Sequence, residues 1–421
     1  MGIGLAGRHR NKPFLMTEDG TIPTFKLDLI QTLAVAAVVF YAGVRLRRAV
    51  KVLDALNIPS AVVGGLMFAG LMLAGRDRWI NIQFDTAMQP LLMVAFFTTI
   101  GMGASLALLK RGGLQVLIFL LVSSVFCFVQ NGIGMAVAGL LGINLLVGVI
   151  AGSVTLVGGP ATGIAFAPLF EKAGVAGADV LAITAATFGI VWGGITGGPV
   201  GTFLIRRHKL RPAPTSGLPA QPELDGRMLT VDPEREDSDL VMNLLVLGVA
   251  MGLGSILSGY FESLGWTLPA YIGAMIVASV FRNIDDRTGL FRVDARAMEF
   301  VGTVSLNTFL VVALMNLKLW ELFHLAGPLF VILVIQVIAV VLAAATFVHW
   351  IMGRDFDSAV MASGFIGFVL GTTANAIANM KTLTARFGPA PKAFLVVPMV
   401  GAFFIDFVNA IIINLFLNWL Q

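Results

Sequence analysis

The sequence predicts an all-α integral membrane protein with about ten transmembrane helices in two inverted repeats, each carrying a re-entrant helical hairpin. Three observations predict this fold class: apolar stretches of bilayer-spanning length recur, two stretches are interrupted by glycine, and positive charges are unevenly distributed. Hydrophobic residues make up 57% of the chain and charged residues 12%. Since a soluble domain has about 25% charged residues, the composition indicates a membrane protein.

Residues 1–26 form a polar N-terminal extension without the apolar segment of a signal peptide. Beyond it, apolar stretches long enough to span a bilayer are separated by short polar segments. The predicted spans are 27–48, 58–75, 88–109, 113–140, 180–205, 240–262, 268–283, 298–317, 325–351 and 393–420.

A charged, proline-rich linker at 206–239 divides the chain into halves at 27–205 and 240–421. If both termini lie outside, most of the 28 Lys and Arg residues fall on the linker side of the membrane. Positive residues are enriched in cytoplasmic loops. We therefore expect a multi-pass protein of the bacterial cytoplasmic membrane, with a cytoplasmic linker and both termini outside.

The two halves resemble each other. The segment 56–64 parallels 266–274, and the Gly158 region parallels the Gly371 region at nearly the same offset. Each half contains five predicted spans, an odd number, so the second half must be inverted relative to the first. Inverted repeats with interrupted helices in corresponding positions are typical of secondary transporters, and the interruptions mark the binding site.

The first predicted hairpin covers 145–171. Its tip cannot continue a helix, because glycine is unfavourable there and proline lacks a donor. The amide groups of the returning helix favour a carboxylate, whereas the carbonyl and hydroxyl oxygens before the tip suit sodium. The substrate-binding candidates are Gly158, Gly159, Ala161, Thr162 and Gly163; the sodium-binding candidates are Thr155, Leu156 and Gly158.

The second predicted hairpin covers 357–386. Hydroxyl and amide side chains follow its glycine tip, and two asparagines four residues apart share one helix face. Polar groups at membrane depth are costly unless paired, so this cluster indicates a polar site. The substrate-binding candidates are Thr372, Thr373 and Asn375; the sodium-binding candidates are Gly371 and Asn379.

Two charged residues complete the candidates. Arg386 could hold a substrate carboxylate in bidentate fashion, although an ordinary interfacial arginine is an equal alternative. Asp406 lies inside the last predicted span, where an ionisable residue indicates function; it is a candidate for binding sodium or a proton, or for pairing with Arg386. Asn131, Asn307 and Asn316 are also polar within spans, and structural hydrogen bonding is the better interpretation for them.

Several other functions are disfavoured. The chain has no phosphate-binding loop, its four histidines lack metal-ligand spacing, and Cys127 is the single cysteine. The net charge of +4 does not indicate nucleic-acid binding. A channel would need a charged ring or carbonyl filter, and a membrane enzyme a nucleophile–base or metal cluster; neither pattern is found.

Four segments resemble the sodium/glutamate symporters: 152–159, 187–194, 376–380 and the long run from Arg386 to Asn409. The similarity extends over nearly the whole chain from about residue 27. The resemblance implies sodium-coupled glutamate import by an inner-membrane homodimer with an elevator mechanism, distantly akin to sodium/citrate symporters. It implies that the protein uses no cofactor, that sodium is the coupling ion, and that membrane lipids surround the protein.

The sequence departs from the family pattern at three places near the hairpin tips. Pro160 and Ala161 stand where members often have His-Gly, and Phe365 and Ile366 where they often have His-Cys. Members also often have Pro near the position of Asn375. Another small carboxylate or an amino acid therefore stays open as the substrate, as does export of an amino acid.

Overall fold

The computed structural model describes residues 14–15, 24–75, 81–111, 113–212, 233–264, 269–322 and 325–420. Within them, six helices are long and apolar enough to cross a membrane, and five shorter apolar helices accompany them. The protein is therefore a multi-pass membrane protein, as predicted. The six long spans are Leu29–Ala49, Gly113–Leu140, Ala178–Arg207, Leu240–Ser263, Ala295–Met315 and Ala326–Ile351. The number of ten spans stays a prediction.

The first half of the chain is helical apart from three short strands. Its helices are α1 (Leu29–Ala49), α2 (Lys51–Ala55), α3 (Ser60–Gly75), α4 (Met88–Gly103), α5 (Leu106–Arg111), α6 (Gly113–Leu140), α7 (Leu145–Val149), the π-helical turn Ile150–Val154, α8 (Gly159–Lys172) and α9 (Ala178–Arg207). Local sequence explains where α1 begins, because Asp28 and Gln31 form a capping box.

The second half of the chain is helical as well. Its helices are α10 (Pro233–Ser263), α11 (Ala270–Thr288), α12 (Ala295–Met315), the 3-10 turn Leu319–Leu322, α13 (Ala326–Ala343), the π-helical turn Ala344–Val348, α14 (His349–Ile351), α15 (Phe356–Leu370), α16 (Thr373–Phe387), α17 (Pro391–Met399), the π-helical turn Val400–Phe404 and α18 (Ile405–Leu420). Asp294 and Asp355 cap the N-termini of α12 and α15 through backbone N–H groups.

The N-terminal extension contributes to a small sheet that the sequence did not predict. Strand β2 (Thr24–Lys26) pairs antiparallel with β1 (Phe14–Leu15) and parallel with β3 (Asn81–Gln83). The sheet ties the start of α1 to the segment before α4. The rest of residues 1–23 lies outside the described residues, as do 213–232 of the predicted linker. Helix α10 begins at Pro233, so the end of that linker is helical.

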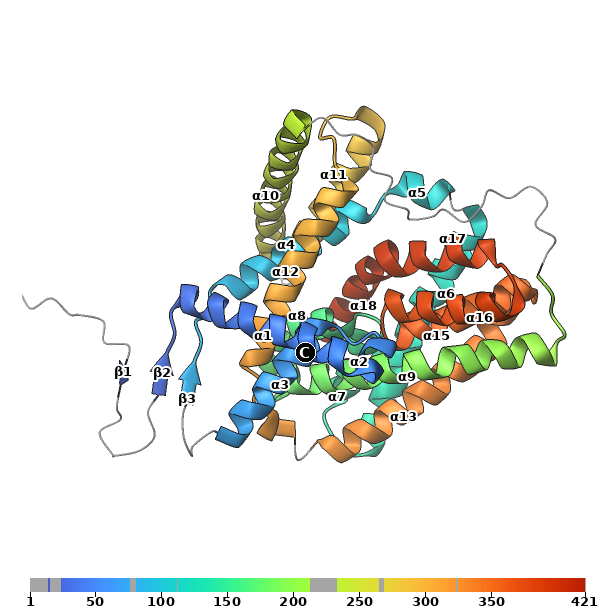
Figure 1. The fold of residues 1–421 in the computed structure, drawn as a ribbon, viewed down its shortest axis with the longest axis horizontal. Helices are drawn as coiled ribbons and strands as arrows, with labels where there is room; N and C mark the ends of the chain where they lie inside the picture. The colour runs from blue at the N-terminus through green and yellow to red at the C-terminus, as the bar shows by residue number, and fades with distance from the viewer. Residues whose placement is uncertain are drawn as a thin grey trace, which may run out of the picture.

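The helices pack into two groups (Figure 1). The scaffold group consists of α1, α3, α4, α10, α11 and α12. The hairpin group consists of α6 to α9 and α13 to α18, and it lies to the right in Figure 1. Within the scaffold group the order of packed neighbours is α1–α3–α12–α4–α11–α10. The order is symmetric: if α1 corresponds to α10, α3 to α11 and α4 to α12, the series of corresponding helices is the same from either end.

Pairs of helices joined at a glycine-containing tip cover both segments predicted as hairpins, and their re-entry into the membrane stays a prediction. The first runs from Leu145 to Lys172, and the second from Phe356 to Phe387. These bounds differ by a residue or two from the predicted 145–171 and 357–386. Glycine and proline interrupt the apolar pattern at the tips, so the sequence locates them well.

Candidate functional site

At the tip of the first hairpin, helix α8 begins without a side-chain cap. Gly152 departs from helical geometry (φ −101°, ψ −134°) inside the π-helical turn, and Gly159 has φ +67°. A side chain is strained at such a positive φ, so glycine is needed at position 159. No side chain caps α8, and Pro160 sits in its first turn. The first backbone N–H groups of α8 are thus left for a ligand.

The tip of the second hairpin has a different chemistry. Thr372 is the N-cap of α16, and its hydroxyl oxygen accepts from the N–H of Asn375 at 3.4 Å. The Thr373 hydroxyl donates to the carbonyl oxygen of Gly401 at 2.7 Å. This second bond joins the tip to the π-helical turn before α18.

The two tips meet. A methyl group placed on Gly159 would lie 3.9 Å from the carbonyl oxygen of Gly371. The structure therefore places the first tip next to the second, and with them the helix starts that carry the predicted substrate-binding residues. These residues are Gly158, Gly159, Ala161, Thr162 and Gly163 of the first hairpin and Thr372, Thr373 and Asn375 of the second. An uncapped and a capped helix end, more than two hundred positions apart in the sequence, thus lie close together.

Asn375 and Asn379 attach the second hairpin to α9. Asn375 Nδ2 donates to the carbonyl oxygen of Ile190 at 2.7 Å, and Asn379 Nδ2 donates to that of Gly193 at 2.8 Å. Asn375 is fully buried, and its Oδ1 has no hydrogen-bond partner among the residues that the structure describes. A buried carbonyl oxygen without a partner is costly. This acceptor is available to a cation or an ammonium group beside the tips.

Helix α9 accommodates this hairpin through glycines spaced four residues apart. Methyl groups on Gly189 and Gly197 would lie 2.1 Å from the Leu370 carbonyl oxygen and 2.1 Å from Asn379 Nδ2. The close approach is what lets the two asparagines reach the α9 carbonyl groups. Methyl groups on Gly152, Gly364 and Gly367 would likewise lie under 3 Å from atoms of Asn131, Met380 and Ala376, which supports helix packing as their role.

Gly189→Ala is expected to destabilise the protein by about 1–3 kcal/mol and to reduce uptake, because the new methyl group pushes the second hairpin off α9. Thermal unfolding in detergent and uptake in proteoliposomes measure this. Gly198→Ala on the same helix is the matched control, since nothing lies within 4 Å of its methyl group. Equal behaviour of the two variants would contradict the packing argument.

Two of the sodium candidates belong to the first hairpin, and Asp406 belongs to the last helix. The Thr155 hydroxyl donates to the carbonyl oxygen of Ile150 at 2.6 Å, and Leu156 is fully buried. Asp406 is partly buried in the first turn of α18, five residues after Gly401. Within the described part of the chain, Asp406 makes no hydrogen bond or ion pair and does not pair with Arg386.

Sequence reasoning missed a buried polar cluster beside the first hairpin. The N–H of Ser153 donates to Asn131 Oδ1 at 2.8 Å, and Asn409 Nδ2 donates to the carbonyl oxygen of Ser153 at 2.8 Å. In the described ranges of the chain, the Ser153 hydroxyl and Asn409 Oδ1 have no hydrogen-bond partner. The structural interpretation of Asn131 is supported, as it is for Asn307 and Asn316, which bond to their own helix. Helix periodicity gives no signal for contacts between α6, the π-helical turn Ile150–Val154 and α18.

Arg386 is not brought to the tips. It is exposed in the last turn of α16, thirteen residues from the start of the helix, or about 20 Å at 1.5 Å per residue. Its guanidinium lies over the ring of Phe387 at 5.3 Å. In this structure Arg386 has the position of an interfacial arginine, and it does not contact the substrate candidates.

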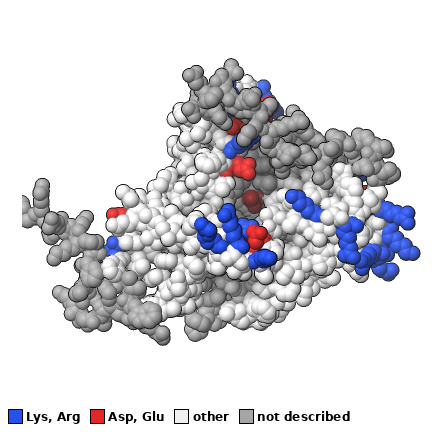
Figure 2. Space-filling view, viewed as in Figure 1, with Lys and Arg blue, Asp and Glu red and all other residues white. Residues whose placement is uncertain are grey.

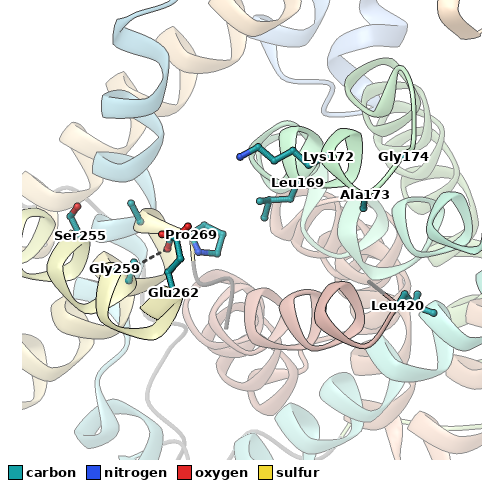
Figure 3. Close-up of a pocket in the computed structure, with 11 residues that line it drawn as sticks. Leu169, Lys172, Ala173, Gly174, Ser255, Gly259, Glu262, Pro269 and Leu420 are labelled. Atoms are coloured by element: carbon teal, nitrogen blue, oxygen red, sulfur yellow. Dashed lines mark hydrogen bonds between the residues drawn. The ribbon is translucent and has the colours of Figure 1, made fainter. Parts of the chain in front are cut away.

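A cavity of about 890 Å³ separates the two helix groups at the far end of α8 (Figure 3). One wall comes from the hairpin group through Leu169 and Lys172, and the other from the scaffold group through Ser255, Gly259 and Glu262. Figure 3 shows Lys172 and Glu262 on opposite walls. The groups are thus not packed tightly against each other at this end.

Interrupted helices whose ends meet inside a multi-pass membrane protein define the class of secondary transporters. The model of the sodium/glutamate symporter family matches residues 25–389. The sodium/glutamate symporter of Escherichia coli (strain K12) is 42% identical over 398 residues, covering 93% of this chain and 98% of the relative. That of Haemophilus influenzae is 38% identical over 393 residues, covering 93% and 97%.

The chain belongs to the sodium/glutamate symporter family. Its relatives are transporters and not enzymes, so the alternative of a membrane enzyme is set aside.

Proposed function

We propose that this protein is a sodium-coupled symporter that imports glutamate across the bacterial cytoplasmic membrane. The observation that carries the proposal is the meeting of the two hairpin tips, together with membership of the family. The uncapped N–H groups of α8 suit a substrate carboxylate. Asn375 Oδ1, buried without a partner, suits the α-ammonium group. The α-carboxylate and the α-ammonium group of an amino acid would thus each have a partner at the tips.

Uptake of labelled glutamate into proteoliposomes, with and without an inward sodium gradient, tests this proposal. We expect uptake to require sodium and to be competed by glutamate more strongly than by other amino acids and dicarboxylates. Labelled uptake should also accelerate when unlabelled substrate is trapped inside, as in a carrier but not in a channel. Sodium-independent uptake, or stronger competition by a different carboxylate, would contradict the assignment.

For the coupling ion we propose sites on both sides of the tips. Thr155, Leu156 and Gly158 offer oxygen atoms from the first hairpin; Gly371, Asn379 and Asp406 offer them from the second half. Hard oxygen ligands are what alkali and alkaline-earth cations prefer. Asp406 without a protein partner supports its inclusion, because an unpaired carboxylate at membrane depth is costly.

At least two sodium ions are expected per glutamate. Thousandfold accumulation of a monoanion against 100 mV costs about 6.4 kcal/mol. One sodium ion with a tenfold gradient supplies only about 3.7 kcal/mol. Parallel measurement of sodium and glutamate fluxes gives the ratio. A ratio of one, together with thousandfold accumulation, would contradict this expectation.

We further propose that 27–205 and 240–421 are inverted repeats and that transport follows an elevator mechanism. The palindromic neighbour order of the scaffold group supports the repeats. The cavity at Lys172 and Glu262, and the sparse packing between the groups, support sliding of the hairpin group along the scaffold group.

The proposed topology has a cytoplasmic linker and both termini outside. Lys and Arg residues gather where α9 ends, at the right of Figure 2, as expected for a cytoplasmic face. Assembly as a homodimer is proposed from the family resemblance.

A further inference from the structure

A cleft of about 720 Å³ lies between the ends of α9 and α16, away from the hairpin tips. We call it the basic cleft. Its lining includes Gly198, Phe203, Arg206 and Arg207 of α9, and Thr382 and Arg386 of α16. The two helix ends are held side by side, because Pro212 packs against Gly388, where the chain has φ +119°.

Three guanidinium groups line the basic cleft without a carboxylate. Arg206, Arg207 and Arg386 are exposed, and within the described residues none of them forms an ion pair. Asp355 and Asp357, at the start of α15, make other hydrogen bonds. Asp355 caps α15, and Asp357 accepts from the N–H of Ala393. Like charges gathered at one cleft repel, so an anion bound between them is favoured.

The cleft continues into an apolar surface. Phe203 is 60% exposed, and Ile195 and Trp192 are 49% and 39% exposed further along α9. A ligand that fits both parts has an anionic head and an apolar chain. Basic clefts between membrane helices bind phospholipid headgroups, and arginine recognises phosphate through paired donors.

We propose that the basic cleft is a binding site for the phosphate headgroup of an anionic phospholipid, with an acyl chain along the exposed face of α9. This inference does not depend on which solute the protein carries. It assigns Arg206, Arg207 and Arg386 to lipid recognition at the membrane surface.

Native mass spectrometry of the full-length protein in detergent, titrated with short-chain phosphatidylglycerol or phosphatidylcholine, tests the proposal. Phosphatidylglycerol should bind preferentially, and Arg206→Gln with Arg207→Gln should weaken its binding about tenfold or more. The matched control is Lys381→Gln with Lys392→Gln, which removes the same charge at the same end but outside the cleft lining. Equal loss in both double variants would mean diffuse attraction and overturn the site.

A second variant keeps every charge. Gly198→Leu puts a side chain into the cleft where its Cβ meets no atom within 4 Å, so the fold should tolerate it. It is expected to weaken phosphatidylglycerol binding as well, because the acyl chain loses its place. Unchanged binding in this variant would overturn the acyl-chain placement. Competition by inorganic phosphate as strong as by the lipid would overturn the lipid assignment in favour of a free anion.

Discussion

Replacing Asn375 with Ala is expected to lower the apparent affinity for glutamate about tenfold to hundredfold. The change removes the donor that holds the second hairpin on the Ile190 carbonyl oxygen at 2.7 Å. It also removes Oδ1, the buried acceptor left without a partner beside the tips. Uptake at varied glutamate concentration gives the affinity and the maximal rate separately.

Asn307→Ala is the matched control for Asn375→Ala. Asn307 Nδ2 bonds only within its own helix, to the Thr303 carbonyl oxygen at 2.8 Å, so its loss should leave uptake near the normal level. Thr373→Ala should also impair uptake, because its hydroxyl joins the tip to Gly401. Unchanged affinity and rate in Asn375→Ala, with normal expression, would show that the tips are not the substrate site.

Cross-linking Lys172→Cys to Glu262→Cys is expected to abolish most uptake if the hairpin group moves along the scaffold group. The two positions line opposite walls of one cavity, and a flexible bis-maleimide can join them. The background is simple to prepare, because Cys127 is the single cysteine of the chain and is buried. Cys127→Ala removes it.

The control cross-link stays within the scaffold group. Ser255→Cys and Ala270→Cys line the same cavity from α10 and α11, which pack against each other. This pair should react without stopping uptake, and a cleavable reagent should restore uptake in the first pair after cleavage. Full transport by the cross-linked Lys172/Glu262 pair would rule out relative motion of the groups.

The membrane class and the hairpin bounds could be predicted because they depend on local chemistry. Apolar length sets the spans, and Gly158-Gly159-Pro160 and Gly371 cannot continue a helix. Threonine and asparagine at membrane depth marked the second tip, since such side chains need partners. These signals lie within a few residues of the features they predict.

The hydrogen-bond partners of the polar side chains at the second tip could not be predicted, because they are backbone atoms distant in sequence. Asn375 bonds to Ile190 and Thr373 to Gly401, and a carbonyl group has no residue-type signature. Arg386 was a candidate for holding a substrate carboxylate because of its guanidinium, with an interfacial arginine as the equal alternative. The rise along α16 places it at the opposite end of the helix from the tip.

The last helix is bonded to the first hairpin through Asn409 and Ser153, and the turn before it to the second hairpin through Gly401 and Thr373. During synthesis the first hairpin is therefore made long before its partner Asn409. Until the final helix is inserted, the Ser153 carbonyl group lacks that donor within the bilayer. A chain truncated before α18 should consequently leave the first hairpin exposed to membrane proteases.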